Sequence, residues 1–403
     1  MKTICFDLRA LQIGHENRGI GMYIKSLLEH IPTTDNKYIF YAYDTSDPIK
    51  ELGINFANNY ELIQTTYIKN AIDSPGDFFN LIKLVSHTFQ PLKSSKPDVF
   101  VQFDFTLGIP RWGRTKKIVI AYDLIPLIKQ NEYLPTIRFA WHHSAGRKAK
   151  LVGIMRSMYY RGKFHFHYKV YKKADQIISI SQATTNSYID LLGISKHKIH
   201  TILLAPVLSD NKVDYAITNR INKPFIFYIG GTDSRKRIQD IIYAFNIVRG
   251  RGDEIALVLA GNEFRTLKQL PNNEGRNAIT NSPYNKDIHL VGFVTDEQKL
   301  GLYQKARAFV FCSMFEGFGL PIVEAMQAGC PVISYNNSSI PEVSGDAAIL
   351  VETGDYCAVA KNVTKLKDPV LRDKIITAGV SKVKMFNWQI TVKKMLNVIL
   401  STP

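Results

Sequence analysis

Two acidic residues flank a glycine-rich turn in residues 315–326, which read FEGFGLPIVEAM. Pro321 suits the first position of a helix, because its missing N–H would have no partner there in any case. The amides of residues 317–319 would then lie at a helix N-terminus, where unpaired N–H groups and the helix dipole favour a bound phosphate. The segment therefore predicts a phosphate site between Glu316 and Glu324.

The two acids need partners other than phosphate. Glu324 lies one turn into the expected helix, and its carboxylate would repel a phosphate nearby. The two hydroxyl donors of a ribose are suitable partners, through charge-assisted hydrogen bonds of about 1.5–3 kcal/mol each. Glu316 is then left for the group attached to the far phosphate. The pattern predicts a clamp for a nucleoside diphosphate and its substituent.

Composition indicates a water-soluble protein of two domains. The chain has 403 residues, 45% of them hydrophobic, and no run approaches the length of a membrane span. Asp7 and Arg9 interrupt the N-terminal segment where a signal peptide needs an apolar core, so we expect no export signal. The four cysteines show no CxxC spacing, which favours small buried residues in a reducing cytoplasm.

Positive charge is concentrated in the first half. The formal net charge is +16, and residues 137–174 contain ten Lys or Arg and no acidic residue. Met, Tyr, Phe and Trp141 are mixed with these cations, as in segments that contact a membrane interface. We expect the segment to bind the anionic inner leaflet or a lipid-linked acceptor, although a solvated helical face is the alternative. The cations concerned are Arg147, Lys148, Lys150, Arg156, Arg161 and Lys163.

Short apolar segments alternate with helical ones along the chain, which predicts parallel sheets built from βαβ units. Strands are expected at 3–8, 38–43, 99–103, 117–121, 176–180, 225–229, 255–260, 288–291, 308–312, 331–335 and 347–350. Helices are expected at 22–30, 77–89, 183–192, 237–249, 296–305, 321–328, 358–366, 370–380 and 388–400. A stretch between Pro206 and Pro224 reads as a linker. The fold class is therefore α/β, with two Rossmann-like, doubly wound domains that face each other across a cleft.

The ordered motifs of the second half resemble those of a known family, the retaining glycosyltransferases with the GT-B fold (family 4-like, group 1), whose hallmark is a Glu-x7-Glu pair. The matching motifs are Glu316 with Glu324, Gly292-Phe293-Val294, Gly317-Phe318-Gly319-Leu320-Pro321, Gly329-Cys330-Pro331-Val332-Ile333 and Pro341-Glu342-Val343. The resemblance implies an acceptor-side domain at 1–205, a donor domain at 206–385 and a C-terminal helix at 386–403 that packs back toward the first domain.

The resemblance also implies roles for residues of the donor domain. Glu324 would hold the ribose and Glu316 the transferred sugar, with the backbone of Phe293 and Val294 on the base. Relatives carry a strand-end pair of cations on the diphosphate. Lys236 matches the usual lysine, whereas Gly231 replaces the usual arginine, and Arg235 is a shifted substitute. The implied donor-binding residues are Gly19, Gly21, Gly230, Gly231, Arg235, Lys236, Phe293, Val294, Glu316, Gly317, Phe318, Gly319, Leu320 and Glu324.

In the first domain, residues 18–23 (RGIGMY) resemble the family's glycine loop. Glycine there would let the backbone approach a diphosphate closely. Many relatives have His-Asp where this chain has Tyr122-Asp123, so a histidine role is not available. Asp123, with Glu316, is the expected catalytic residue, although a helix or turn cap is the alternative for Asp123.

We therefore expect a retaining hexosyltransferase that needs neither a cofactor nor a metal, since the chain has no Asp-x-Asp motif and His165 and His167 lack a set of co-ligands. The resemblance favours transfer of mannose from GDP-mannose to a glycan or lipid-linked acceptor of a bacterial surface polysaccharide, O-antigen or capsule, at the cytoplasmic face of the membrane. Rhamnosyl, glucosyl or galactosyl transfer from dTDP- or UDP-sugars is the alternative. Two alternatives belong to other functional classes: a sugar-nucleotide epimerase, and a non-catalytic binder of nucleotide sugars or nucleic acid. The sequence contains no recognised nucleic-acid-binding module that would support nucleic-acid binding.

Overall fold

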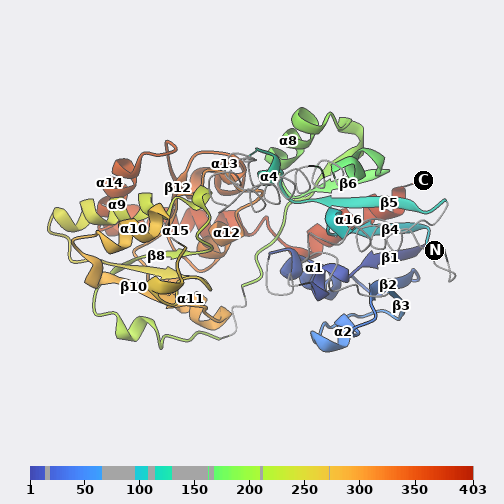
Figure 1. Ribbon diagram of the computed structural model, residues 1–403, viewed down its shortest axis with the longest axis horizontal. Helices are drawn as coiled ribbons and strands as arrows, with labels where there is room; N and C mark the ends of the chain where they lie inside the picture. The colour runs from blue at the N-terminus through green and yellow to red at the C-terminus, as the bar shows by residue number, and fades with distance from the viewer. Residues whose placement is uncertain are drawn as a thin grey trace, which may run out of the picture. The chain divides into compact units, whose positions relative to one another are not determined.

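The computed structural model describes residues 1–13, 19–65, 96–107, 114–128, 162, 168–208, 212–271 and 273–402. The chain divides into two units. Unit 1 comprises Met1–Leu204 and Trp388–Pro403, and unit 2 comprises Ala205–Asn387. In each unit, helices cover a twisted parallel sheet (Figure 1).

Unit 1 contains a seven-stranded sheet in the order β3-β2-β1-β4-β5-β6-β7, and every recorded pairing is parallel. The strands are β1 (Thr3–Asp7), β2 (Lys37–Tyr43), β3 (Tyr60–Thr65), β4 (Val99–Gln102), β5 (Lys116–Ala121), β6 (Gln176–Ser179) and β7 (Ile199–Thr201). The central strands are apolar and buried on both faces, as expected for a sheet covered by helices on both sides. The described helices of this unit are α1 (Gly19–Glu29), α2 (Pro48–Glu51), α4 (Ile125–Ile128), α8 (Gln182–Leu192) and α16 (Trp388–Ser401).

Helix α1 starts earlier than the sequence predicts. A glycine loop at 18–21 and a helix from Met22 were expected, but Gly19 and Gly21 lie inside the helix. Glycine only weakens a helix, by about 1 kcal/mol relative to alanine. The buried residues Tyr23, Ile24 and Leu27 outweigh that cost by packing one face of α1 on the core.

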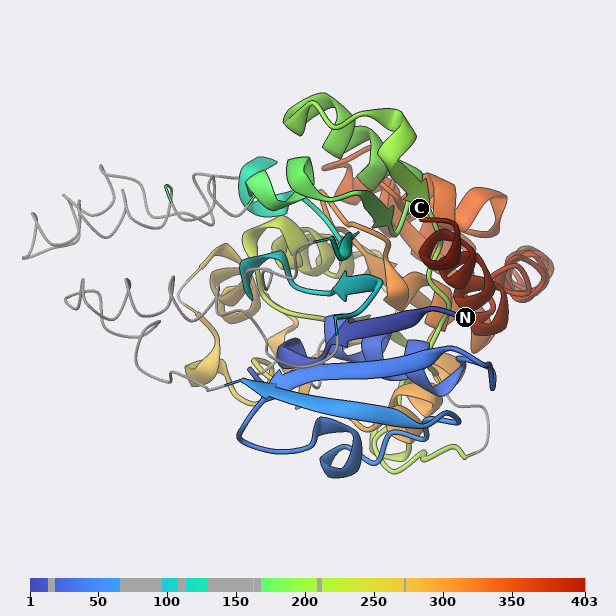
Figure 2. The ribbon, with the colours of Figure 1, turned by 90° about the vertical axis from the view of Figure 1, so that its right-hand side faces the viewer.

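Helix α16 belongs to unit 1 although it ends the chain. The Trp388 ring lies 5.8 Å from the ring of Tyr23, whose hydroxyl is 3.4 Å from the sulfur of Met395. The Lys2 ammonium donates to the carbonyl of Thr402 at 2.6 Å, so the two ends of the described chain lie together (Figure 2).

Unit 2 contains a six-stranded parallel sheet in the order β10-β9-β8-β11-β12-β13. The strands are β8 (Phe225–Ile229), β9 (Ala256–Ala260), β10 (Ile288–Gly292), β11 (Ala308–Phe311), β12 (Val332–Tyr335) and β13 (Ile349–Val351). The helices are α9 (Ile238–Gly250), α10 (Glu274–Thr280), α11 (Asp296–Lys305), α12 (Leu320–Gln327), α13 (Ile340–Ser344), α14 (Tyr356–Lys365) and α15 (Pro369–Val383). The order reverses between β8 and β11, which is the switch point where such sheets bind ligands.

Several expectations need correction. Residues 212–221 do not form a free linker, because Val213, Ile217 and Ile221 pack on the core of unit 2. Pro321 takes the second position of α12, since the helix already begins at Leu320. Strands β3 and β7 were not predicted, nor were the short helices α2, α4, α10 and α13. The helix expected at 77–89 lies outside the described residues.

Candidate active site

Two loops at the carboxyl edge of the unit 2 sheet carry the residues that the sequence singled out. The cation loop (residues 230–237) follows β8, and the acid loop (residues 312–319) follows β11. These strands are neighbours in the sheet, so their loops are adjacent. The backbone N–H of Met314 donates to the carbonyl of Arg235 at 2.8 Å, which ties the loops together.

The structure brings three predicted residues into direct contact. Oε1 of Glu316 accepts hydrogen bonds from Nη1 of Arg235 and from Nζ of Lys236, each at 2.6 Å. Nη1 of Arg235 also donates to the carbonyl of Phe315 at 2.9 Å. The three side chains are only 10–13% exposed. Sequence reasoning assigned the cations to phosphate and the acid to the sugar, and did not anticipate that they pair with each other.

The charges in this cluster are mutually dependent. Burial would raise the pKa of Glu316, but Lys236 and Arg235 outweigh burial and hold that pKa below its usual value. Burial lowers the pKa of Lys236, and the attraction of Glu316 offsets this only in part. The Lys236 ammonium also lies 4.7 Å from the centroid of the Phe311 ring, a favourable cation–π contact. The cluster places concentrated positive charge in a region of low solvent exposure, which suits an anionic ligand.

A third loop, residues 336–339 after β12, holds the acid loop in place. The amide of Glu316 donates to Oγ of Ser338 at 2.9 Å, and Ser338 has a left-handed φ of 48°. Oγ of Ser339 contacts the carbonyls of Glu316 and Phe318, each at 3.0 Å. These contacts fix the direction in which the acid loop presents its backbone.

The N-terminus of α12 has the features of a phosphate site. Gly319 is the N-cap residue with φ 98°, and no side chain caps the helix. Within the described chain, no hydrogen bond is recorded for the amides of Gly319 and Leu320. The ring of Phe318, just before them, is buried and packs edge-on against Phe386. Free amides and the helix dipole make this end attractive to an anion. The amide of Gly317 was predicted to join them and lies in the same loop.

Glu324 lies in the second turn of α12 and is 5% exposed. Its Oε1 accepts from the Lys299 ammonium at 3.1 Å, and its Oε2 lies 3.5 Å from the hydroxyl of Tyr303. Burial raises the pKa of Glu324 above its usual value, although Lys299 opposes that effect. The sequence did not identify Lys299, because nothing in the helix pattern distinguishes it from a surface lysine.

Glycines permit close backbone packing at the start of the cation loop. A Cβ on Gly261, after β9, would lie 2.1 Å from the carbonyl oxygen of Gly230, and the φ of Gly261 is 137°. A Cβ on Gly230 would lie 2.6 Å from the hydroxyl of Tyr228, which donates to the carbonyl of Gly231 at 2.7 Å. Gly230 and Gly231 therefore shape the loop that carries the cations.

The strand end at β10 presents one exposed aromatic ring. Phe293 is 60% exposed, whereas the adjacent Val294 is buried at 8%. Gly292 before them has φ 69°, which turns the chain at the edge of the sheet. The predicted base-binding backbone therefore lies at the carboxyl edge of the same sheet as the two loops.

An ion pair between half-buried Arg237 and buried Asp240, next to the cations, was missed by sequence reasoning. Arg237 has a left-handed φ of 50° and donates from Nε and Nη2 to both oxygens of Asp240, each at 2.9 Å. The hydroxyl of Tyr335 donates to Oδ2 of Asp240 at 2.6 Å. This pair holds the end of the cation loop, whereas the sequence placed Arg237 only at the start of the helix expected at 237–249.

In unit 1, Asp123 makes the capping contact that was its alternative assignment. Its Oδ1 accepts from the amide of Ile125, the first residue of α4, at 2.9 Å. The Tyr122 hydroxyl is buried, and no hydrogen-bond partner for it is recorded among the described residues.

A second pair that the sequence did not reveal stands at the end of β1. The Arg9 guanidinium donates to both oxygens of Asp7, at 2.8 and 2.7 Å, and to the carbonyl of Leu107 at 3.0 Å. Arg9 is 4% exposed and lies over the Tyr41 ring at 4.8 Å. Both residues were noted only as obstacles to a signal peptide.

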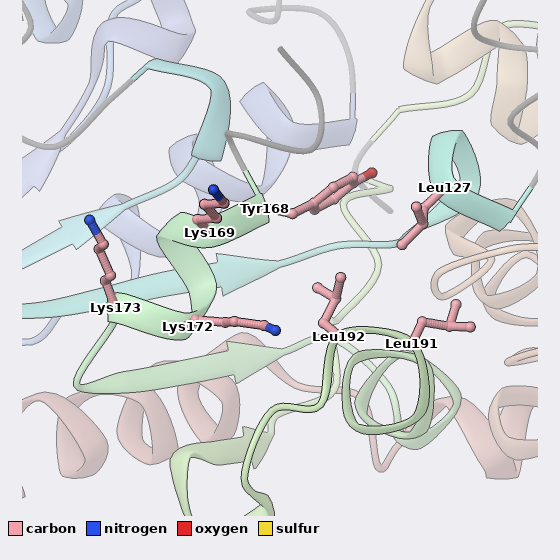
Figure 3. Close-up of a pocket in the computed structure, with 7 residues that line it drawn as sticks. All are labelled: Leu127, Tyr168, Lys169, Lys172, Lys173, Leu191 and Leu192. Carbon is pink, nitrogen blue, oxygen red and sulfur yellow. The ribbon is translucent and has the colours of Figure 1, made fainter. Parts of the chain in front are cut away.

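A groove of about 480 Å³ in unit 1 has leucines at one end and lysines at the other (Figure 3). Its lining residues are Leu127, Tyr168, Lys169, Lys172, Lys173, Leu191 and Leu192. None of the predicted donor residues lines it. The three lysines belong to the described end of the basic segment, whereas Arg147, Lys148, Lys150, Arg156, Arg161 and Lys163 lie outside the described residues.

The described residues show neither a membrane-spanning helix nor a cluster of metal ligands. No helix among them is both long enough and apolar enough to cross a membrane. In the same ranges, no three or more His, Cys, Asp or Glu side chains are grouped as metal ligands. His165 and His167 lie outside these ranges.

The second half of the chain is similar in sequence to known glycosyltransferases. The family model "Glycosyl transferases group 1" matches residues 214–381. The O-antigen chain mannosyltransferase B of Escherichia coli is 33% identical over 178 residues, covering 43% of this chain and 45% of that protein. The serotype-specific mannosyltransferase WbdA of Escherichia coli is 24% identical over 302 residues, covering 70% of this chain and 33% of that protein. The chain thus spans less than half the length of these relatives.

The fold of the whole chain has solved counterparts. Anabaena HepE, whose structure was solved in complex with UDP-glucose, superposes with a TM-score of 0.69 at 13% identity, over 100% of both chains. At that identity the likeness concerns the fold alone. The chain has the two-domain, Rossmann-like GT-B fold. Residues 214–381, which carry the cation loop, the acid loop and Glu324, belong to the group 1 glycosyltransferase family.

Proposed function

We propose that this chain transfers a hexose, with retention of anomeric configuration, from a nucleotide sugar to a glycan or lipid-linked acceptor in the synthesis of a bacterial surface polysaccharide. GDP-mannose is the proposed donor; similarity to two E. coli mannosyltransferases supports mannose as the transferred sugar. The observation that carries the proposal is the cluster of Arg235, Lys236 and Glu316 beside the open N-terminus of α12.

The chemistry follows from these charges. As the sugar departs, negative charge develops on the diphosphate, and Lys236, Arg235 and the amides at Gly319 and Leu320 are proposed to stabilise it. Donor phosphate would compete with Glu316 for the two cations. The Glu316 carboxylate, released from them in part, would then contact the positively charged sugar. The proposed scheme requires no metal; full activity after treatment with EDTA is its expected result, and abolished activity that returns with a divalent cation contradicts it.

For unit 1 we propose acceptor recognition, with Asp123 bonding a sugar hydroxyl and the glycines at the start of α1 approaching phosphate. The basic segment is proposed to bring the protein to the anionic inner face of the cytoplasmic membrane. Lys169, Lys172 and Lys173 support this, since no ion pair is recorded for them within the described ranges. Co-sedimentation with vesicles containing anionic lipid should exceed that with neutral vesicles, and replacing Lys169, Lys172 and Lys173 by Gln should reduce the difference. Equal recovery with both vesicles contradicts the membrane proposal.

A thermal-shift screen against GDP, UDP and dTDP tests the donor class, because a ligand that binds the folded state raises the melting temperature by mass action. The largest shift is expected with GDP. A larger shift with UDP or dTDP would contradict GDP-mannose as the donor and support the alternative of glucosyl, galactosyl or rhamnosyl transfer. No shift with any nucleotide contradicts the donor site.

A transfer assay with labelled nucleotide sugar then separates the classes of activity. Label moved to a lipid or glycan acceptor supports the proposal. Interconversion of the free donor without acceptor identifies an epimerase, and binding without either reaction identifies a non-catalytic binder. Both of the latter results overturn the proposed transfer.

A further inference from the structure

Lys299 and Glu324 form a buried ion pair between α11 and α12. The Lys299 ammonium lies 3.1 Å from Oε1 of Glu324 and 2.9 Å from Oδ1 of Asp296. The side chains of Lys299 and Glu324 are 8% and 6% exposed, whereas that of Asp296 is 50% exposed. Among the described residues, Lys299 is the cation bonded to Glu324.

Three groups on α11 face the Glu324 carboxyl, namely Lys299, Asp296 and Tyr303. Burial raises the pKa of Glu324 most, Lys299 lowers it, and Asp296 adds a smaller rise. On the other elements around α12, the Cys330 thiol faces Tyr303, and Arg372 of α15 is bound to the carbonyls of residues 306 and 307. Lys299 is therefore the main group that favours the ionised form of Glu324.

Ionisation decides what Glu324 can recognise. A carboxylate has about four lone-pair positions on two oxygens. Lys299 takes one on Oε1, and the Tyr303 hydroxyl lies at the limit of hydrogen-bonding distance from Oε2. Each oxygen keeps a position for one hydroxyl donor. A protonated carboxyl would turn one acceptor into a donor and could no longer accept from both hydroxyls of a diol.

We propose that Lys299 is a positioning residue for donor recognition, which keeps the Glu324 carboxylate ionised and oriented so that both its oxygens accept from the ribose diol of the nucleotide. This inference rests on the proposed ribose role of Glu324. It adds a residue to the donor site that the motif pattern does not contain.

The test compares GDP with 2′,3′-dideoxy-GDP by calorimetry between pH 5.5 and 8.5, or the corresponding UDP or dTDP pair if the screen selects that base. The variants are Lys299→Met, Lys299→Arg and the matched control Lys305→Met. Lys305 lies on the same helix, with its ammonium 5.2 Å from the Tyr215 ring, and is not in contact with Glu324.

The wild-type protein should prefer the ribose form by at least tenfold to a hundredfold near neutral pH, because the dideoxy analogue loses both hydroxyls and each charge-assisted hydrogen bond contributes about that factor. In Lys299→Met the preference should be lost at the acidic end and return as the pH rises. Lys299→Arg and Lys305→Met should follow the wild type. A preference in Lys299→Met that equals the wild type at every pH, or is reduced by one constant factor, overturns the inference.

Asp296→Asn tests the same point if Lys299→Met does not fold. Removing this half-exposed acid takes away a negative charge that raises the pKa of Glu324 and that competes for Lys299. Glu324 should then stay ionised, and the ribose preference should persist, to a lower pH than in the wild type. An unchanged pH profile overturns the inference. If the wild-type protein itself does not distinguish the two nucleotides, the ribose role of Glu324 fails, and the proposed function loses that support. If it does and the variants change nothing, only the role of Lys299 fails.

Discussion

The ammonium of Lys236 lies 2.6 Å from Oε1 of Glu316, and the two side chains are 10% and 11% exposed. The same oxygen accepts from Arg235, so one carboxylate occupies both cations that the proposed function assigns to phosphate. Donor binding in this site would therefore exchange one anionic partner for another. That exchange predicts how substitutions at either residue divide between affinity and turnover.

Glu316→Gln should lower turnover about a hundredfold, the size of effect seen when one preorganised electrostatic contact to a transition state is removed. Affinity for the nucleoside diphosphate should stay the same or rise, because the neutral amide competes less with phosphate for Arg235 and Lys236. Calorimetry and steady-state kinetics separate the two effects. Glu352→Gln, an exposed acid after β13, is the matched control. Unchanged turnover in Glu316→Gln removes this residue from catalysis.

The same substitution should change the pH dependence of stability. The pKa of Glu316 is lowered in the folded protein, so the ionised carboxyl contributes stability above its unfolded pKa, near 4.5, which is lost as the pH falls. The unfolding free energy of the wild type should therefore fall more steeply below about pH 4.5 than that of Glu316→Gln. Urea denaturation at pH 3.5, 4.5 and 6 measures this difference, and parallel profiles contradict it.

Lys236→Arg should change the alkaline limb of nucleotide binding. Because burial lowers the pKa of Lys236, the wild-type affinity for nucleoside diphosphate should fall at a pH below the ordinary lysine range. A guanidinium stays charged throughout, so Lys236→Arg should keep its affinity up to pH 10.5. Lys236→Met should weaken binding about tenfold to a hundredfold at neutral pH. If the affinity of Lys236→Arg falls at the same alkaline pH as that of the wild type, a group other than Lys236 is responsible for the fall.

Tyr335→Phe should destabilise the end of the cation loop. The substitution removes a hydroxyl that donates to buried Asp240, and a hydrogen bond to a charged group contributes about 1.5–3 kcal/mol. Since Asp240 holds Arg237 in its left-handed conformation, nucleotide affinity should also fall several-fold. Tyr356→Phe is the control, because no hydrogen bond is recorded for that hydroxyl in the described structure. Equal unfolding free energies for the two variants would show that Asp240 needs no partner besides Arg237.

The success of sequence reasoning depended on how local each signal is. Helix α11 has the expected bounds, 296–305, because Thr295 and Gln298 form a capping box that marks its start. The apolar strands β8 and β9 were likewise predicted from continuous buried runs. Strand β3, by contrast, lies at the sheet edge and carries exposed polar residues, Glu61 and Gln64, that are three positions apart, so it shows no period-2 alternation that would identify a strand.

Contacts between distant segments could not be predicted. Arg235 and Glu316 are 81 residues apart and meet only because β8 pairs with β11. The Lys299–Glu324 pair depends in the same way on how α11 and α12 pack, which helix periodicity does not specify. The motif identified the acids, whereas the sheet order identifies their partners.

Gly261→Ala should show that the cation loop depends on close backbone packing. The added Cβ would lie 2.1 Å from the carbonyl oxygen of Gly230, and backbone cannot yield as a flexible side chain can. Gly252→Ala is the matched control, since Gly252 also has a positive φ, 84°, but open space around its Cβ. The control should lose about 1–2 kcal/mol of unfolding free energy from the left-handed backbone alone. Gly261→Ala should lose clearly more and should also weaken nucleoside diphosphate binding, because Gly230 begins the loop that carries Arg235 and Lys236. If both variants lose the same stability and bind nucleotide equally well, position 261 requires glycine because of its positive φ, and the close approach to Gly230 is not the reason.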